Sequence, residues 1–174
     1  MKYHPLSATR FITWATHPKI SPRIRGLIEH FAHHKAVLKY QRLTSVPIQV
    51  ATSSSCAVAW YESENMPNDL MSSKLLLSES DIQATWKDLR LVGRVDQAYE
   101  SKQGKVILVD SKAHPKVTFR DQLQLSFYAY IMLKNGYRVS DVGYIRSFAY
   151  QDIEYLAVDI IPAQAFVEIL SLID

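Results

Sequence analysis

The sequence predicts a single α/β domain in which a mixed β-sheet is flanked by helices. Hydrophobic patterns along the chain follow the order helix, three strands, helix, two strands and helix. The chain has 174 residues, which is enough for one core that buries well over half of the unfolded surface. Because 48% of the residues are hydrophobic and only five are glycine, disorder is not expected. Residues 1–174 are therefore expected to form one domain.

The first long helix is expected over residues 22–40. Ser21 and Pro22 fit the N-cap and first helical position, and apolar residues recur behind them at helical spacing. Residues 43–80 carry mixed signals, with three consecutive serines, two prolines and short apolar patches. We expect irregular structure with one short helix there, as a variable insertion region of the domain.

A β-meander is expected next. Segments 82–87 and 90–99 have strand character, residues 101–104 supply turn residues, and the run 106–109 is rich in β-branched residues. Thr118 and Asp121 resemble a capping box, and an apolar segment continues to Asn135-Gly136, which predicts a helix over 119–134. Strands are expected over 142–149 and 153–160, and a last helix after Pro162.

The cysteine count and the hydropathy of the chain indicate the cellular compartment in which we expect it. Cys56 is the single cysteine, so an internal disulfide and a multi-cysteine metal site are excluded. No apolar run is long enough to span a membrane, and the amino terminus lacks the pattern of a secretory signal. We expect a soluble protein of the reducing cytoplasm, with no membrane partner.

Basic residues are concentrated in the first quarter of the chain. Up to residue 42 the only acid is Glu29, which makes this segment a candidate surface for a polyanion. A solvated helix face is the alternative interpretation. The basic residues are Lys2, Arg10, Lys19, Arg23, Arg25, Lys35, Lys39 and Arg42.

The stretch ILVDSKAH, residues 107–114, ends an apolar strand with Asp110 and Lys112. Side chains alternate along a strand, so these two project from one face. Folding the hairpin about Gln103 places Asp96 opposite Asp110, where two carboxylates about 5 Å apart repel by about 3 kcal/mol. A bound divalent cation such as magnesium would compensate, and so would simple neutralisation by Lys112 or Arg94 on a solvated face. A shift of one residue would move Asp96 to the other face.

Four sequence pieces then appear in a familiar order. They are Gly26-Leu27-Ile28-Glu29-His30, Gly93-Arg94-Val95-Asp96, Asp110-Ser111-Lys112 and Gln124-Leu125-Ser126-Phe127-Tyr128. In this order and on these elements, the chain resembles the PD-(D/E)XK nuclease superfamily, in the branch of the RecB nuclease domain and the CRISPR-adaptation exonucleases. The resemblance implies a restriction-endonuclease-like αβββαβ core with flanking helices.

The resemblance also implies the metal site. Asp96, Asp110 and the main-chain carbonyl of Ser111 would bind the metal, and Lys112 would be the catalytic lysine. His30 would approach the metal as the histidine of the first piece. The helical wheel alone does not single His30 out, and His33 and His34 remain alternatives from the residues themselves.

Gln124 and Tyr128 lie four residues apart and so share one side of the second long helix. From the residues alone they are a polar pair at the border of an apolar face. The resemblance places Gln124 near the metal-bound water or a substrate phosphate and gives Tyr128 a supporting catalytic role. Gln122 becomes a rival if the motif is misaligned.

One departure from that branch concerns its iron–sulfur cluster. Members with a cluster have an early cysteine-proline pair and three late cysteines, whereas this chain has His17-Pro18 and no late cysteine. We therefore expect no iron–sulfur cluster.

The predicted function is a Mg²⁺- or Mn²⁺-dependent deoxyribonuclease, an exonuclease on DNA ends or single strands in recombination, repair or mobile-element processing. A helicase or recombination protein is the expected partner. The alternatives are a nucleic-acid-binding module or an interaction subunit that keeps the fold without turnover. Tyr40, Trp60 and Tyr61 are candidates for base stacking, although such aromatics also pack in cores. The residues expected to bind the DNA backbone are Arg23, Arg25, Lys35, Lys116 and Arg120.

Overall fold

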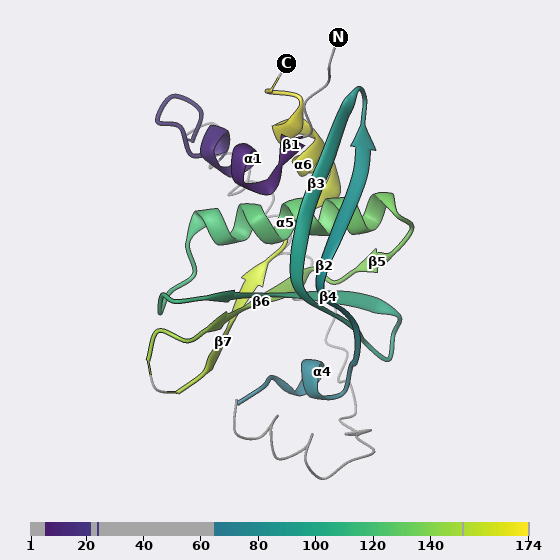
Figure 1. Cartoon of the computed structure of the whole chain (residues 1–174), viewed down its shortest axis with the longest axis vertical. Helices are drawn as coiled ribbons and strands as arrows, with labels where there is room; N and C mark the ends of the chain where they lie inside the picture. Colours follow the sequence, from purple (N-terminus) through teal and green to yellow (C-terminus); the bar gives the residue numbers. More distant parts are fainter. Residues whose placement is uncertain (1–5, 22–23, 25–64, 151, 174) are drawn as a thin grey trace, which may run out of the picture.

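The structure is a computed structural model that describes residues 6–21, 24, 65–150 and 152–173. In this part of the chain, seven strands form one mixed sheet, and helices cover both of its faces (Figure 1). The strands are β1 Leu6–Ser7, β2 Lys74–Trp86, β3 Leu89–Glu100, β4 Lys105–Lys112, β5 Arg138–Val139, β6 Val142–Ser147 and β7 Glu154–Asp159. The helices are α1 Ala8–Ala15, α4 Asn68–Met71, α5 Phe119–Lys134 and α6 Ala163–Leu170.

The sheet combines an antiparallel meander with a parallel crossover. Strands β2, β3 and β4 pair antiparallel in succession, α5 then returns the chain so that β6 pairs parallel with β4, and β7 closes the edge antiparallel to β6. The short strands β1 and β5 add parallel to β3 and β4. The predicted α/β class with a restriction-endonuclease-like core is confirmed, while the helix predicted over 22–40 lies outside the described residues except for Ile24.

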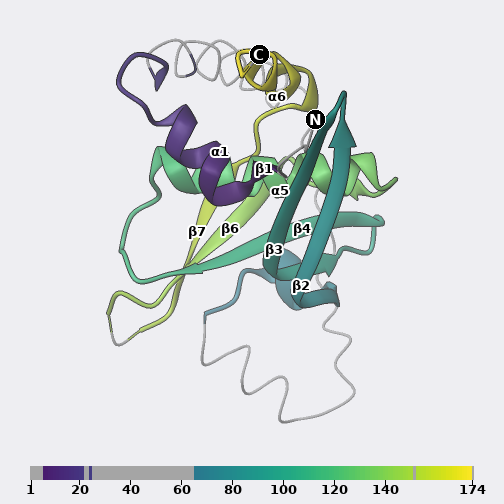
Figure 2. The same ribbon diagram turned by 45° about the horizontal axis from the view of Figure 1, so that its top comes forward.

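The two faces of the sheet bury separate apolar clusters. Helix α5 crosses one face, and α1 and α6 pack on its outer side (Figures 1 and 2). The Phe11 ring joins these helices, since its centroid lies 5.2 Å from that of Phe127 and 5.3 Å from that of Phe166. On the other face, Leu70 of α4 and Met66, which precedes the helix, pack against residues of β3 and β4. No described helix has the length and apolar character needed to cross a membrane.

Local sequence fixes the bounds of α5 as predicted. The Thr118 side chain accepts a hydrogen bond from the Asp121 amide, and the Asp121 carboxylate accepts one from the Thr118 amide at 2.7 Å, so the capping box is complete. The helix ends at Lys134 with Asn135 as its C-cap, and Gly136 has a φ of +86°, which favours glycine. This helix carries Gln124 and Tyr128 on the face that meets the sheet.

Several element boundaries differ from the sequence predictions. Strand β2 begins at Lys74 rather than near residue 82, so residues 74–80 belong to the sheet instead of an irregular insertion. A register shift between Leu75 and Leu77 and a φ of +47° at Glu79 break the alternation of side chains, which explains why the pattern looked irregular. Strand β6 ends at Ser147, and α1, β1 and β5 were not predicted.

Candidate active site

The β3–β4 hairpin has the register predicted from the turn. Gln97 pairs with Val109 and Ala98 with Leu108, so Asp96 and Asp110 are the next opposed positions. The backbone ladder ends there, because the Ser111 amide donates to Asp96 Oδ2 at 2.8 Å. The Asp96 carboxylate is thereby fixed beside the strand that carries Asp110.

The alternation of side chains along β3 changes at Asp96, opposite an unusual backbone conformation in β2. Val95 and Ala98 both belong to the α5-side cluster, which is impossible in a regular strand because residues an odd number apart face opposite sides. Glu79 lies opposite Asp96, between the Ser78–Gln97 and Ser80–Val95 pairs, and its φ is +47°. Its carboxylate accepts a hydrogen bond from Arg94 Nε at 3.1 Å. The change in alternation places Asp96 on the α5 side, near Asp110.

Asp110 is a buried carboxylate, with 2% of its surface exposed. Its Oδ1 accepts a hydrogen bond from Gln124 Nε2 at 2.9 Å, and its Oδ2 lies 2.6 Å from Lys112 Nζ. Burial raises the pKa of Asp110 to about 6, and the nearby charges of Asp96 and Asp121 add to the rise, while Lys112 opposes it. The site therefore strongly favours a positive charge beside this carboxylate.

Gln124 connects the charged groups through both ends of its amide. Its Oε1 accepts from Lys112 Nζ at 3.2 Å, and its Nε2 donates to Asp110 Oδ1 and to the Tyr128 hydroxyl at 3.0 Å. The amide orientation is determined, because an ammonium group only donates and a carboxylate only accepts. Gln124 thus fixes the positions of Lys112 and Asp110 relative to each other.

Tyr128 is buried, and its hydroxyl accepts the hydrogen bond from the Gln124 side-chain amide. Burial raises the pKa of Tyr128 to about 12, and the charges of Asp110 and Asp96 contribute, so the hydroxyl is neutral at physiological pH. The Tyr128 ring packs closely against β3 at Gly93, where an added Cβ would lie 2.5 Å from Tyr128 Cε1. Gly93 belongs to one of the four sequence pieces, but this packing role was not predicted, although a glycine within a strand is itself a sign of close packing.

The donor set fits a hard divalent cation. Asp110 Oδ2 is buried and receives no hydrogen bond of good geometry from the described residues, despite the close ammonium of Lys112. A second carboxylate, Asp96, lies at the same end of the hairpin, and carboxylate oxygens are preferred ligands of Mg²⁺ and Mn²⁺. Among the described residues no group of three His, Cys, Asp or Glu side chains surrounds a single point. His30, the remaining predicted ligand, lies outside the described residues.

The other predicted residues fall into two groups. Lys116, in the loop between β4 and α5, and Arg120, in the first turn of α5, are exposed close in sequence to Lys112. The remaining predicted DNA-binding and stacking residues lie outside the described part of the chain. They are Arg23, Arg25, Lys35, Tyr40, Trp60 and Tyr61.

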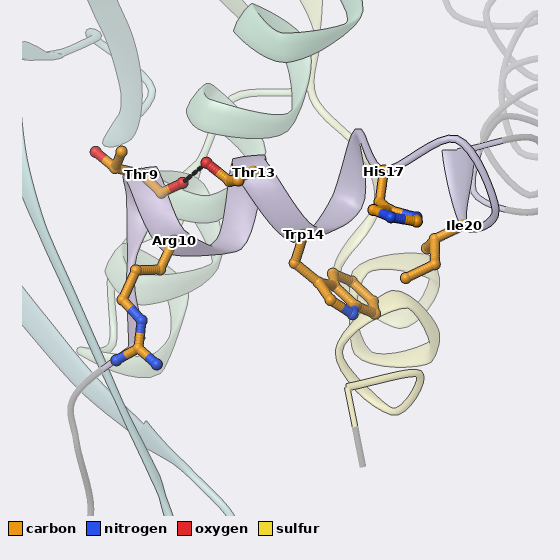
Figure 3. Close-up of a pocket in the computed structure, with 6 residues that line it drawn as sticks. All are labelled: Thr9, Arg10, Thr13, Trp14, His17 and Ile20. Atoms are coloured by element: carbon orange, nitrogen blue, oxygen red, sulfur yellow. Dashed lines mark hydrogen bonds between the residues drawn. The ribbon is translucent and has the colours of Figure 1, made fainter.

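A separate open cavity of about 540 Å³ lies along α1 (Figure 3). Its lining combines the indole of Trp14 with Ile20, Arg10 and His17. None of the residues that contact Asp110 lines it, so this cavity is distinct from the carboxylate site.

Comparisons with known proteins agree with this geometry. The model of the PD-(D/E)XK nuclease superfamily matches residues 18–160, and the chain therefore belongs to that superfamily. The predicted superfamily is confirmed, while the RecB-like branch stays a prediction. Membership supports nuclease activity, since the superfamily is one of nucleases.

Comparisons with solved structures and with curated proteins carry no further argument about function. A solved structure titled "Crystal structure of SSO0001" shares 11% identity, covers 98% of this chain and 75% of its own, and superposes with a TM-score of 0.46. The search of curated proteins gave no match.

Proposed function

We propose that the chain is a divalent-metal-dependent deoxyribonuclease that hydrolyses phosphodiester bonds at DNA ends or in single strands. The observation that carries this proposal is the network of Lys112 and Gln124 around the buried Asp110 carboxylate, with Asp96 held beside it. Its catalytic residues are Asp96, Asp110, Lys112, Gln124 and Tyr128.

Asp96 and Asp110 would hold Mg²⁺ or Mn²⁺, together with the main-chain carbonyl of Ser111 and His30. The bound ion supplies Lewis acidity and lowers the pKa of its water. The Lys112 ammonium, one-quarter exposed, can turn from Asp110 toward a substrate phosphate and stabilise the negative charge that develops there. Gln124 limits that movement, because its Oε1 accepts from Lys112 while its Nε2 donates to Asp110.

Charge outside the network supports a nucleic-acid substrate. The chain carries a formal net charge of +3, and exposed Lys116 and Arg120 follow directly after the strand that ends at Lys112. In this proposal the basic residues Arg23, Arg25 and Lys35 also contact the DNA backbone, so affinity falls as salt rises. An exonuclease that works with a helicase or recombination protein is the form of the activity that we favour.

The test is cleavage of end-labelled single- and double-stranded DNA in Mg²⁺ and in Mn²⁺. Lys112→Met should reduce cleavage by about 100-fold or more while folding and DNA affinity are kept, because it removes one charge aimed at the reacting phosphate. Lys105→Met is the matched control, since Lys105 begins the same strand at its far end. It should cleave normally.

Three results would contradict the proposal. Full activity in Lys112→Met would remove this lysine from the mechanism. Binding of DNA by the unaltered chain without cleavage in either metal would favour a non-catalytic binding subunit. Cleavage that requires an added protein would favour an interaction subunit of a larger assembly.

A further inference from the structure

Two large aromatic side chains are exposed in the loop that follows β6. Phe148 is 47% exposed and Tyr150 is 67% exposed, and neither belongs to the apolar clusters of the described residues. Exposing an aromatic ring of this size forgoes the stabilisation that burial would give. Two such rings, separated by one residue, form a candidate binding surface.

The loop is joined directly to the strand that carries the candidate active site. The Phe148 amide donates to the Lys112 carbonyl at 2.9 Å, and Ser147 pairs with Lys112 in the sheet. The buried Ser147 hydroxyl also donates to the His114 carbonyl at 2.8 Å. The β6–β7 loop and the β4–α5 connection therefore meet beside Lys112, on the same side of the molecule (Figures 1 and 2).

Charges divide this surface into two sides. On the β4–α5 side, Lys116 and Arg120 are exposed and basic. On the β6–β7 side, exposed Asp152 and Glu154 follow the aromatics and would repel phosphates. A strand that crosses Lys112 would thus keep its phosphates over the β4–α5 connection and turn its bases toward Phe148 and Tyr150.

We infer that Phe148 and Tyr150 form a stacking surface for unpaired bases next to the phosphate bound at Lys112. Aromatic rings stack on any nucleobase and so favour a single strand without selecting its sequence, whereas bases in a duplex are covered by their neighbours. The inference rests on the proposed function for the position of the strand. Stacking itself requires neither the metal nor cleavage.

The test measures binding of the full chain, without divalent metal, to a fluorescent oligothymidylate and to an abasic deoxyribose-phosphate strand of equal length. The unaltered chain should bind the thymidylate more tightly. Phe148→Ser and Tyr150→Ser should each weaken thymidylate binding by about tenfold and leave abasic binding unchanged. Phe148→Trp and Tyr150→Phe keep a ring and should retain the affinity.

The control is Tyr137→Ser. Tyr137 is 40% exposed but lies between α5 and β5, at the other end of α5. The inference would be overturned if a loop variant lost equal affinity for the thymidylate and the abasic strand. It would also be overturned if neither loop variant lost affinity for the thymidylate, and the two aromatic residues would then be a contact for another protein. A chain that shows the expected stacking but does not cleave DNA in Mg²⁺ or Mn²⁺ would refute the proposed nuclease and leave the stacking surface standing.

Discussion

The substitution Gly93→Ala tests whether the Tyr128 ring positions the candidate active site. Gly93 lies in β3, and the buried Tyr128 ring covers it from α5. An alanine here needs no unusual backbone conformation, since the φ of Gly93 is not positive. Its only new feature is one methyl group directed at the ring.

The size of the effect follows from two distances. The added Cβ would lie 2.5 Å from Tyr128 Cε1 and 2.9 Å from Cδ1, whereas carbon atoms pack at about 3.5–4.0 Å. The ring must therefore move by about 1 Å, and overpacking of this kind costs about 1–3 kcal/mol. The same movement displaces the Tyr128 hydroxyl from its 3.0 Å hydrogen bond with Gln124. Misplacement on this scale lowers kcat by about 10- to 100-fold.

The assay combines thermal unfolding with the rate of DNA cleavage. Gly93→Ala should lower the melting temperature by about 2–4 °C for each kcal/mol lost and should lower kcat with little change in DNA affinity. Gly104→Ala is the control. Its φ of +68° strains an alanine, but no described atom lies within 4 Å of the added Cβ, so stability should fall while cleavage remains normal.

A double variant gives the sharper result. In a Tyr128→Ala background the ring is absent, so adding Gly93→Ala should cost little further stability. Equal losses from Gly93→Ala with and without the ring would show that the two residues do not interact. Normal stability and cleavage in Gly93→Ala alone would refute the positioning argument.

Three further predictions concern the same network. The pKa of Asp110 is about 6 in the folded chain, against an ordinary value of 3.8. The folded state therefore loses stability as the pH rises from about 4 to about 6, because the buried carboxyl group must ionise. Asp110→Asn should raise the melting temperature more at about pH 8 than at about pH 4. Because the ionised carboxylate binds the cation, Mg²⁺ affinity measured by calorimetry should rise with pH up to about 6 and then level off. Gln124→Leu should slow cleavage strongly, whereas Gln122→Leu, which loses only a bond to the Asp159 carbonyl, should not.

Much of the architecture was predictable because its determinants are local. The capping box at Thr118 and the Asn135-Gly136 pair set the two ends of α5, and each acts through residues only a few positions away in the sequence. The turn at Gly104 fixed the hairpin register, and with it the opposition of Asp96 and Asp110, since strand pairing follows from the turn that joins the strands. The residues of the candidate site were proposed from the sequence with the help of a family resemblance.

The tertiary structure decided what depends on contacts between distant segments. Strands β1 and β5 are two residues long and exist only because β3 and β4 offer free edges, so no local pattern marks them. The amide of Gln124 joins Asp110 and Lys112, and the ring of Tyr128 requires a glycine at 93, only because α5 packs across the sheet. The sequence by itself determined where the elements lie and which side chains face the same way. Packing decided which atoms meet, because the close fit of side chains is a property of two surfaces that the chain brings together only when it folds.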